Sequence, residues 1–157
     1  MPSTEPHANM TRVYICSGGT DFMADILAFP HEDRHRYTVL IVDDEPAIRG
    51  FLYDHLSQCG FNPLTVASGD EAVALLEKEI SVDLVFSDVR MPGTLDGFGL
   101  ARWVRDHRPG LPVLLASGDL GKVSRELVAE IVPKPYDFDV VVRKMHAALD
   151  RRARCSA

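Results

Sequence analysis

Acidic side chains follow two apolar, strand-like runs of the chain. Asp43 and Asp44 come directly after Val39–Val42, and Asp88 closes the run that begins at Leu84. A charged residue at the tip of a buried strand costs free energy unless it has a partner or a function. These three carboxylates are therefore the first candidates for chemistry.

Two more apolar runs end on a polar group. Val113–Ala116 precede Ser117, and Ile131–Pro133 precede Lys134. Carboxylates crowded together repel one another, which raises their pKa values unless a cation intervenes. An all-oxygen site without Cys or His ligands suits Mg²⁺, and the ammonium of Lys134 adds a second, point-like positive charge.

Together these groups indicate phosphoryl chemistry. Transfer of a phosphoryl group depends on neutralising its equatorial oxygens and aligning the nucleophile. A metal, an ammonium and a hydroxyl around one carboxylate meet both needs, and the carboxylate can itself be the nucleophile and form an aspartyl-phosphate. The alternative is that each residue is structural, with Asp44 capping a helix and Lys134 neutralising a carboxylate.

From Thr38 onward, strand-like runs alternate with amphipathic, helix-like segments, which is typical of a parallel sheet with helices on both faces. Ligands of such sheets bind beyond the carboxyl ends of the strands. All the polar groups above lie on that edge, so we expect them to converge. The predicted strands are Val39–Val42, Pro63–Ala67, Leu84–Asp88, Val113–Ala116 and Ile131–Val132, and the predicted helices begin at Pro46, at the capping box Ser68–Glu71, after Gly97 and at Phe138.

The order of these motifs resembles the receiver domain of two-component response regulators over about Thr38 to Arg152. The resemblance is carried by Val39-Leu40-Ile41-Val42-Asp43-Asp44-Glu45, by Asp88-Val89-Arg90-Met91-Pro92-Gly93, by Ser117 and by Lys134-Pro135. It implies an α/β fold with a doubly wound, five-stranded parallel sheet in the flavodoxin-like order 2-1-3-4-5.

The resemblance also implies a role for each site residue. Asp88 would accept a phosphoryl group from the phosphohistidine of a histidine kinase or a histidine phosphotransfer protein. Asp44, Asp88 and the backbone carbonyl of Arg90 would bind Mg²⁺ directly, with Asp43 acting through metal-bound water. Ser117 would follow the phosphoryl group, Lys134 would pair with it, and the Lys134–Pro135 bond would be cis.

The chain departs from the family pattern between Ser117 and Lys134. The family usually has an aromatic switch residue three positions before the lysine, where this chain has Ile131. Only 17 steps separate Ser117 from Lys134, which predicts a shortened fourth helix. We therefore expect the signal to use the loop after Ser117. Arg90 and Asp119 are expected at the mouth of the site, either paired as a lid or as two solvated charges.

Three segments are predicted. Residues 1–37 form an extension, expected to be flexible, with a role in partner docking or dimerisation as the alternative. Residues 38–152 form the receiver domain, and residues 153–157 form a tail that is too short for an effector domain. The expected protein is thus a stand-alone regulator that signals by contact with an unknown downstream protein, as a phosphate shuttle, a sink or an adaptor.

Composition excludes other classes of protein. A formal net charge of −6 without a basic stripe argues against nucleic-acid binding. No apolar run is long enough to span a membrane, and three widely spaced cysteines indicate a reduced, cytoplasmic protein. A Mg²⁺-dependent phosphohydrolase with an aspartate nucleophile is the enzyme alternative. By resemblance to that class, such an enzyme would need a second aspartate two positions after the nucleophile, where this chain has Arg90, so catalytic turnover is not expected. A receiver-like interaction module that is never phosphorylated is the remaining alternative.

Overall fold

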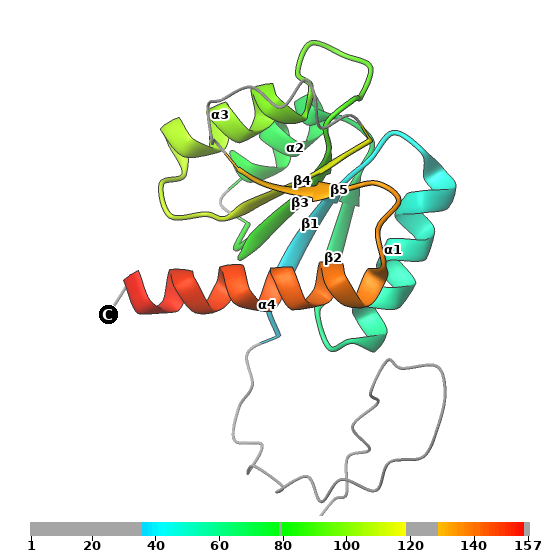
Figure 1. Cartoon of the computed structure of the whole chain (residues 1–157). Coiled ribbons are helices and arrows are strands. Elements are labelled where there is room, and N and C mark those ends of the chain that lie inside the picture. The colour runs from blue at the N-terminus through cyan, green and yellow to red at the C-terminus, as the bar shows by residue number, and fades with distance from the viewer. Residues whose placement is uncertain (1–35, 79, 119–128, 156–157) are drawn as a thin grey trace, which may run out of the picture.

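The computed structural model describes residues 36–78, 80–118 and 129–155, and these form a parallel sheet flanked by helices (Figure 1). The strands lie in the order β2-β1-β3-β4-β5, which confirms the predicted topology. Their bounds are β1 Thr38–Val42, β2 Asn62–Val66, β3 Leu84–Asp88, β4 Val113–Ser117 and β5 Glu130–Pro133. The edge position predicted for the strand that contains Pro63 is also confirmed, because β2 is an outer strand.

Four described helices cover the two faces of this sheet. Helices α1 and α4 pack on one face, and α2 and α3 pack on the other (Figure 1). Their bounds are α1 Pro46–Gln58, α2 Gly69–Leu76, α3 Gly97–His107 and α4 Phe138–Cys155. No helix in the described part of the chain has the length and hydropathy that a membrane span requires.

The inner strand β1 is apolar without alternation because helices cover the sheet on both faces. Val39 and Ile41 belong to the core cluster under α1 and α4, whereas Leu40 and Val42 belong to the cluster under α2 and α3. Because successive side chains of a strand point to opposite faces, a strand covered on both faces needs an apolar residue at each position.

Side-chain caps fix where two of the helices begin. At the start of α2 the hydroxyl of Ser68 accepts the N–H of Glu71 at 3.2 Å, as the capping box predicts. The carboxylate of Glu71 accepts the N–H of Ala67 at 2.9 Å, one residue before the position that the motif usually uses. Asp96 caps α3 by accepting the N–H of Gly99 at 2.7 Å.

Some expectations differ from the structure or lie outside its described residues. The sequence predicts that Phe51 belongs to the apolar residues that repeat at helical spacing after Pro46, yet Phe51 is 55% exposed because the core side of α1 is filled by Leu52 and Leu56. Helix α4 continues through Cys155, into residues 153–157, which the sequence predicts to be a tail. The N-terminal extension up to residue 35 and the short helix expected within residues 122–128 lie outside the described residues.

Candidate phosphoacceptor site

The parallel register brings the polar strand ends together at one edge of the sheet. Asp88 is aligned with Ala116 of the neighbouring strand, and Ser117 is aligned with Pro133, the residue before Lys134. The Lys134 ammonium lies 3.1 Å from Oδ1 of Asp88, with the two side chains 27% and 14% exposed. The predicted convergence of Lys134 and Asp88 at one edge of the sheet is thus present in the structure, whereas the pairing of Lys134 with a phosphoryl group stays a prediction.

Asp43 lies deeper at the same edge, with 3% of its surface exposed. Its Oδ1 accepts the backbone N–H of Glu45 at 2.9 Å. Burial raises the pKa of the Asp43 carboxyl above the ordinary value of 3.8, and the charges of Asp88 and Asp44 raise it further. The hydrogen bond from Glu45 and the charge of Lys134 lower this pKa without offsetting the rise. The ionisation of Asp43 therefore depends on the charges of Asp44, Asp88 and Lys134.

Asp43→Asn is expected to raise the melting temperature of the metal-free protein by a few degrees near neutral pH. Because the pKa of Asp43 is raised in the folded protein, its ionised form favours the unfolded chain at any pH above that pKa. The gain should shrink as the pH falls toward 3.8, where the carboxyl becomes protonated in both states. Thermal unfolding with a chelator at neutral and acidic pH measures it, and a loss of stability near neutral pH would contradict it.

Ser117 and Lys134 are joined through the backbone as well as through the sheet. The N–H of Lys134 donates to the carbonyl of Ser117 at 2.7 Å, and Ser117 is buried. The Lys134–Pro135 peptide bond is cis, as the resemblance implies. The role of the Ser117 hydroxyl toward a phosphoryl group stays a prediction.

Gly97 fixes the backbone just after Asp88, although the sequence pattern did not place this glycine at the site. Gly97 donates its N–H to the carbonyl of Val89 at 2.9 Å, and Val89 donates to the carbonyl of Ala116 at 3.0 Å. A Cβ at Gly97 would overlap the carbonyl oxygen of Asp88 and lie 2.8 Å from the Cα of Val89. Only a residue without a side chain lets α3 approach the candidate phosphoacceptor so closely.

Gly97→Ala is expected to destabilise the protein by about 1–3 kcal/mol, because backbone must move to accommodate the added methyl group. It should also slow any reaction at Asp88, whose carbonyl is displaced. Gly50→Ala is the matched control. Gly50 lies within α1 with no atom within 4 Å of a Cβ, so alanine there should stabilise by roughly 0.5–1 kcal/mol. Chemical denaturation compares the two, and effects of the same sign would contradict this account.

Three other predicted positions have different outcomes. Arg90 is exposed in the loop after Asp88. Asp119 lies outside the described residues, so the lid formed by these two residues stays a hypothesis. Ile131 is partly buried and packs on the cluster under α2 and α3, on the sheet face away from α1.

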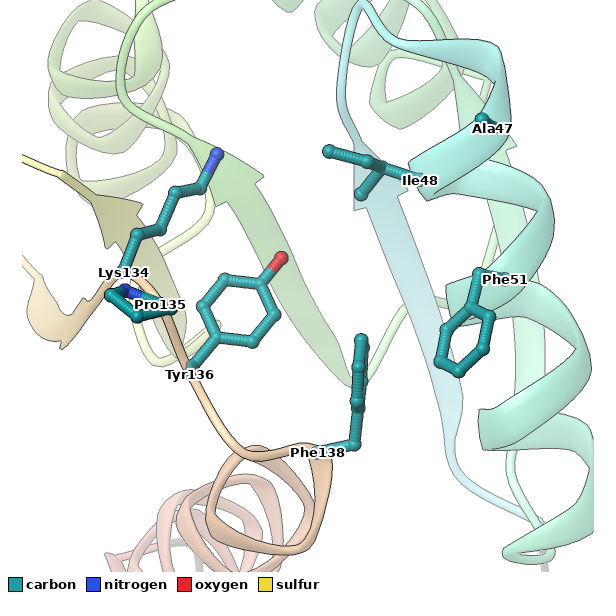
Figure 2. A pocket seen from close by; sticks show the side chains of 7 residues that line it. All are labelled: Ala47, Ile48, Phe51, Lys134, Pro135, Tyr136 and Phe138. Carbon is teal, nitrogen blue, oxygen red and sulfur yellow. The ribbon is translucent and has the colours of Figure 1, made fainter.

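Tyr136 is a site neighbour that the sequence pattern did not reveal. Its ring makes edge contacts with Phe86 and Phe138, at centroid distances of 5.9 and 5.6 Å. Burial, together with the charges of Asp43 and Asp88, raises the pKa of Tyr136 to about 12, so its hydroxyl keeps its proton at neutral pH. Figure 2 shows the Tyr136 ring on the same side of the sheet as Lys134, with its hydroxyl directed toward the neighbouring strand.

The donor set at this edge is made of oxygen atoms, which fits Mg²⁺. Among the residues that the structure describes, no three acidic, histidine or cysteine side chains are arranged to hold a metal ion by themselves. Mg²⁺ usually binds through one or two carboxylates and completes its shell with water and phosphate oxygens. Asp88 and the exposed Asp44 suit that mode, and both lie close enough to Asp43 to raise its pKa.

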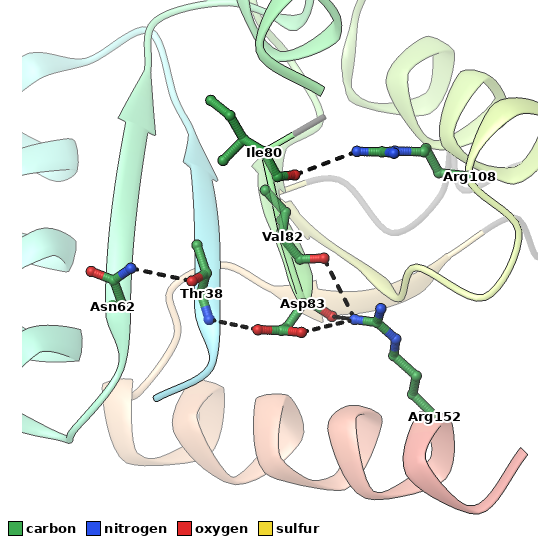
Figure 3. A network of polar contacts seen from close by, with 7 residues as sticks. All are labelled: Thr38, Asn62, Ile80, Val82, Asp83, Arg108 and Arg152. Carbon is green, nitrogen blue, oxygen red and sulfur yellow. Dashed lines mark hydrogen bonds and ion pairs between the residues drawn. The ribbon is translucent and has the colours of Figure 1, made fainter. Parts of the chain in front are cut away.

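A second polar cluster, at the opposite edge of the sheet, is structural (Figure 3). Asp83 accepts the N–H of Thr38 at 2.9 Å and lies 3.3 Å from the guanidinium of Arg152. The guanidinium of Arg108 donates to the carbonyls of Leu76 and Ile80. These contacts tie the ends of helices to the loop before β3, so the carboxylate of Asp83 already has its partners.

A doubly wound sheet with an aspartate–lysine pair at its carboxyl edge is the architecture expected of a receiver domain. The family model of the response regulator receiver domain matches residues 39–146. The chain therefore belongs to the response regulator receiver family.

Similar proteins agree with this assignment. The chain is 33% identical to the DNA-binding transcriptional regulator NtrC of Salmonella typhimurium, covering 73% of this chain and 25% of NtrC. It is 31% identical to the transcriptional regulatory protein GlrR of Escherichia coli, covering 78% of this chain and 28% of GlrR. The chain thus spans about a quarter of the length of these curated relatives.

Solved structures show the same fold. The response regulator TrrA of Thermotoga maritima, in complex with Mg²⁺ and BeF, is 30% identical with a TM-score of 0.66, covering 71% of this chain and 98% of TrrA. The chemotaxis protein CheY4 of Vibrio cholerae is 26% identical with a TM-score of 0.66, covering 73% of this chain and 99% of CheY4.

Proposed function

We propose that this receiver domain accepts a phosphoryl group on Asp88 from the phosphohistidine of a histidine kinase or a histidine phosphotransfer protein. The observation that carries the proposal is the 3.1 Å contact between the Lys134 ammonium and the Asp88 carboxylate at the carboxyl edge of the sheet. An oxygen of Asp88 would attack phosphorus, the P–N bond would break, and the imidazole would keep the electron pair. The product is an acyl phosphate.

The residues around Asp88 would stabilise the charge of the transferred group. The Lys134 ammonium is already positioned at the carboxylate, and it would turn to the phosphoryl oxygens as they arrive. Asp44, Asp88 and the backbone carbonyl of Arg90 would hold a Mg²⁺ ion, with Asp43 acting through water, and the ion would supply positive charge to the phosphoryl oxygens. TrrA supports this part of the proposal, since it was solved with Mg²⁺ and BeF.

We propose signalling rather than turnover as the outcome, with a downstream protein reading the phosphorylated state. Arg90 stands where a phosphohydrolase would need an acid to protonate its leaving group. The cytoplasm is the proposed location, because three widely spaced cysteines are typical of a reducing compartment.

Incubation with acetyl phosphate and Mg²⁺, followed by intact-protein mass spectrometry, tests the proposal. The wild-type protein should gain one phosphoryl group only when the metal is present, and Asp88→Asn should gain none. An unmodified wild-type protein would instead support an interaction module that is never phosphorylated. Equal uptake by Asp88→Asn would show that the acceptor is another residue.

A further inference from the structure

The loop that joins β3 to α3 carries Arg90, whose backbone carbonyl is a ligand in the proposed Mg²⁺ site. The side chain of Arg90 is exposed, between the buried side chains of Val89 and Met91. The base of the loop is closed by the hydrogen bond from the N–H of Gly97 to the carbonyl of Val89. Residues 92–94, the outer half of the loop, are exposed, so packing in the core does not fix them.

The outer half of this loop is bonded to the start of α2. The carboxylate of Asp70, the second residue of α2, accepts the N–H of Thr94 at 3.2 Å and also the hydroxyl of Thr94. The hydroxyl bond is the main cause that lowers the pKa of Asp70 below the ordinary value of 3.8, so this carboxylate is ionised at neutral pH. Hydrogen bonds to a charged acceptor are stronger than those between neutral groups.

Two glycines allow α2 and the loop to approach each other this closely. A Cβ at Gly69 would lie 2.6 Å from the carbonyl oxygen of Leu95, and a Cβ at Gly93 would lie 2.9 Å from Oδ2 of Asp70. Gly93 also has a φ of 125°, which residues with a side chain rarely adopt. Because the buried Leu76 anchors α2 on the sheet, the start of α2 is a firm support for the loop.

We propose that Asp70 is a positioning residue for the Mg²⁺ site of this domain. By holding Thr94, Asp70 keeps the outer half of the loop on α2 and so fixes where the carbonyl of Arg90 lies. Groups that bond a metal ligand directly change metal affinity roughly 10–100-fold when they are removed. Asp70 acts through the intervening loop, so its effect should be smaller. This inference rests on the proposed function, which assigns the carbonyl of Arg90 to the metal.

Titration of the full chain with Mg²⁺, followed by amide NMR, provides the first test. Asp70→Ala should raise the Kd for Mg²⁺ about three- to tenfold, with little change in melting temperature. Thr94→Val removes the hydroxyl but no charge, and it should raise the Kd about two- to threefold. Glu71→Gln is the matched control, because it removes a charge next to Asp70 from a side chain that bonds Ala67 rather than the loop. Its Kd should stay close to the wild-type value.

Three further measurements separate positioning from a general loss of structure. The double variant Asp70→Ala, Thr94→Val should raise the Kd no more than Asp70→Ala alone, because both residues act through one contact. Amide hydrogen exchange of residues 90–97 in the metal-free protein should be several-fold faster in Asp70→Ala than in the wild type. Phosphoryl uptake by Asp70→Ala should be slow at low Mg²⁺ and return to the wild-type rate at saturating Mg²⁺.

The outcomes distinguish this inference from the proposed function. If the wild type binds Mg²⁺ and Asp70→Ala binds it equally tightly, the positioning role is overturned and the proposed function stands. Equal weakening by Glu71→Gln would also overturn it, since loss of charge rather than of the loop contact would then be the cause. A wild-type protein that binds no Mg²⁺ would overturn both the positioning role and the metal part of the proposed function.

Discussion

Replacing Lys134 with methionine is expected to slow phosphoryl uptake at Asp88 about 100-fold or more, the usual effect of removing one preorganised donor from a transition state. Methionine keeps the length of the side chain and removes the ammonium that lies 3.1 Å from the Asp88 carboxylate. The phosphoryl oxygens would then lack a partner in a partly buried site. The rate of uptake from acetyl phosphate, followed by intact mass at saturating Mg²⁺, measures the effect.

Lys144→Met is the matched control for this experiment. Lys144 pairs with Glu130 at 2.6 Å on the surface between β5 and α4, with both side chains about one-third exposed. An exposed pair of this kind contributes little to stability, and it lies away from the strand ends. Uptake should be unchanged. If Lys134→Met took up phosphoryl groups within about twofold of the wild-type rate, electrostatic stabilisation by Lys134 would not be part of the mechanism.

Phe86→Ala is expected to destabilise the domain by about 3–5 kcal/mol, as usual for a buried aromatic residue replaced by alanine. Phe86 lies in the central strand β3, two residues before Asp88, and is 2% exposed. Its loss would leave a cavity beneath Tyr136, whose ring it contacts. A loss of this size is a large part of the total stability of a small domain.

Phe51→Ala is the matched control for Phe86→Ala, because it separates the effect of burial on stability from the effect of losing a phenylalanine ring. Phe51 is also a phenylalanine, but it lies 55% exposed on α1, so its replacement should change the free energy of unfolding by less than about 0.5 kcal/mol. Chemical denaturation of both variants gives the comparison. Similar losses for the two variants would mean that Phe51 is covered in solution to the same degree as Phe86.

The architecture was predictable because its signals are local and repeated. Continuous apolar runs such as Val39–Val42 identify strands covered on both faces, and their alternation with amphipathic segments predicts the parallel order that the structure confirms. The convergence of Asp43, Asp88 and Lys134 followed from the same topology, since parallel strands end at one edge.

What the sequence did not reveal depends on contacts between distant segments. Gly97 differs from other glycines only because α3 touches the backbone of Asp88. Tyr136 belongs to the site because a turn after β5 brings its ring against Phe86. Phe51 fits the apolar pattern of α1, but Leu52 lies about 100° further around the helix, so one narrow face cannot bury both.

Locating the phosphoryl group by chemical trapping tests the central claim most directly. The protein is incubated with acetyl phosphate and Mg²⁺, reduced with borohydride, which converts an aspartyl-phosphate to homoserine, and digested for tandem mass spectrometry. We predict homoserine at position 88 and at no other aspartate, with none formed when Mg²⁺ is withheld. Homoserine at Asp43 or Asp44, or a phosphoryl adduct that leaves Asp88 unreduced, would contradict the account.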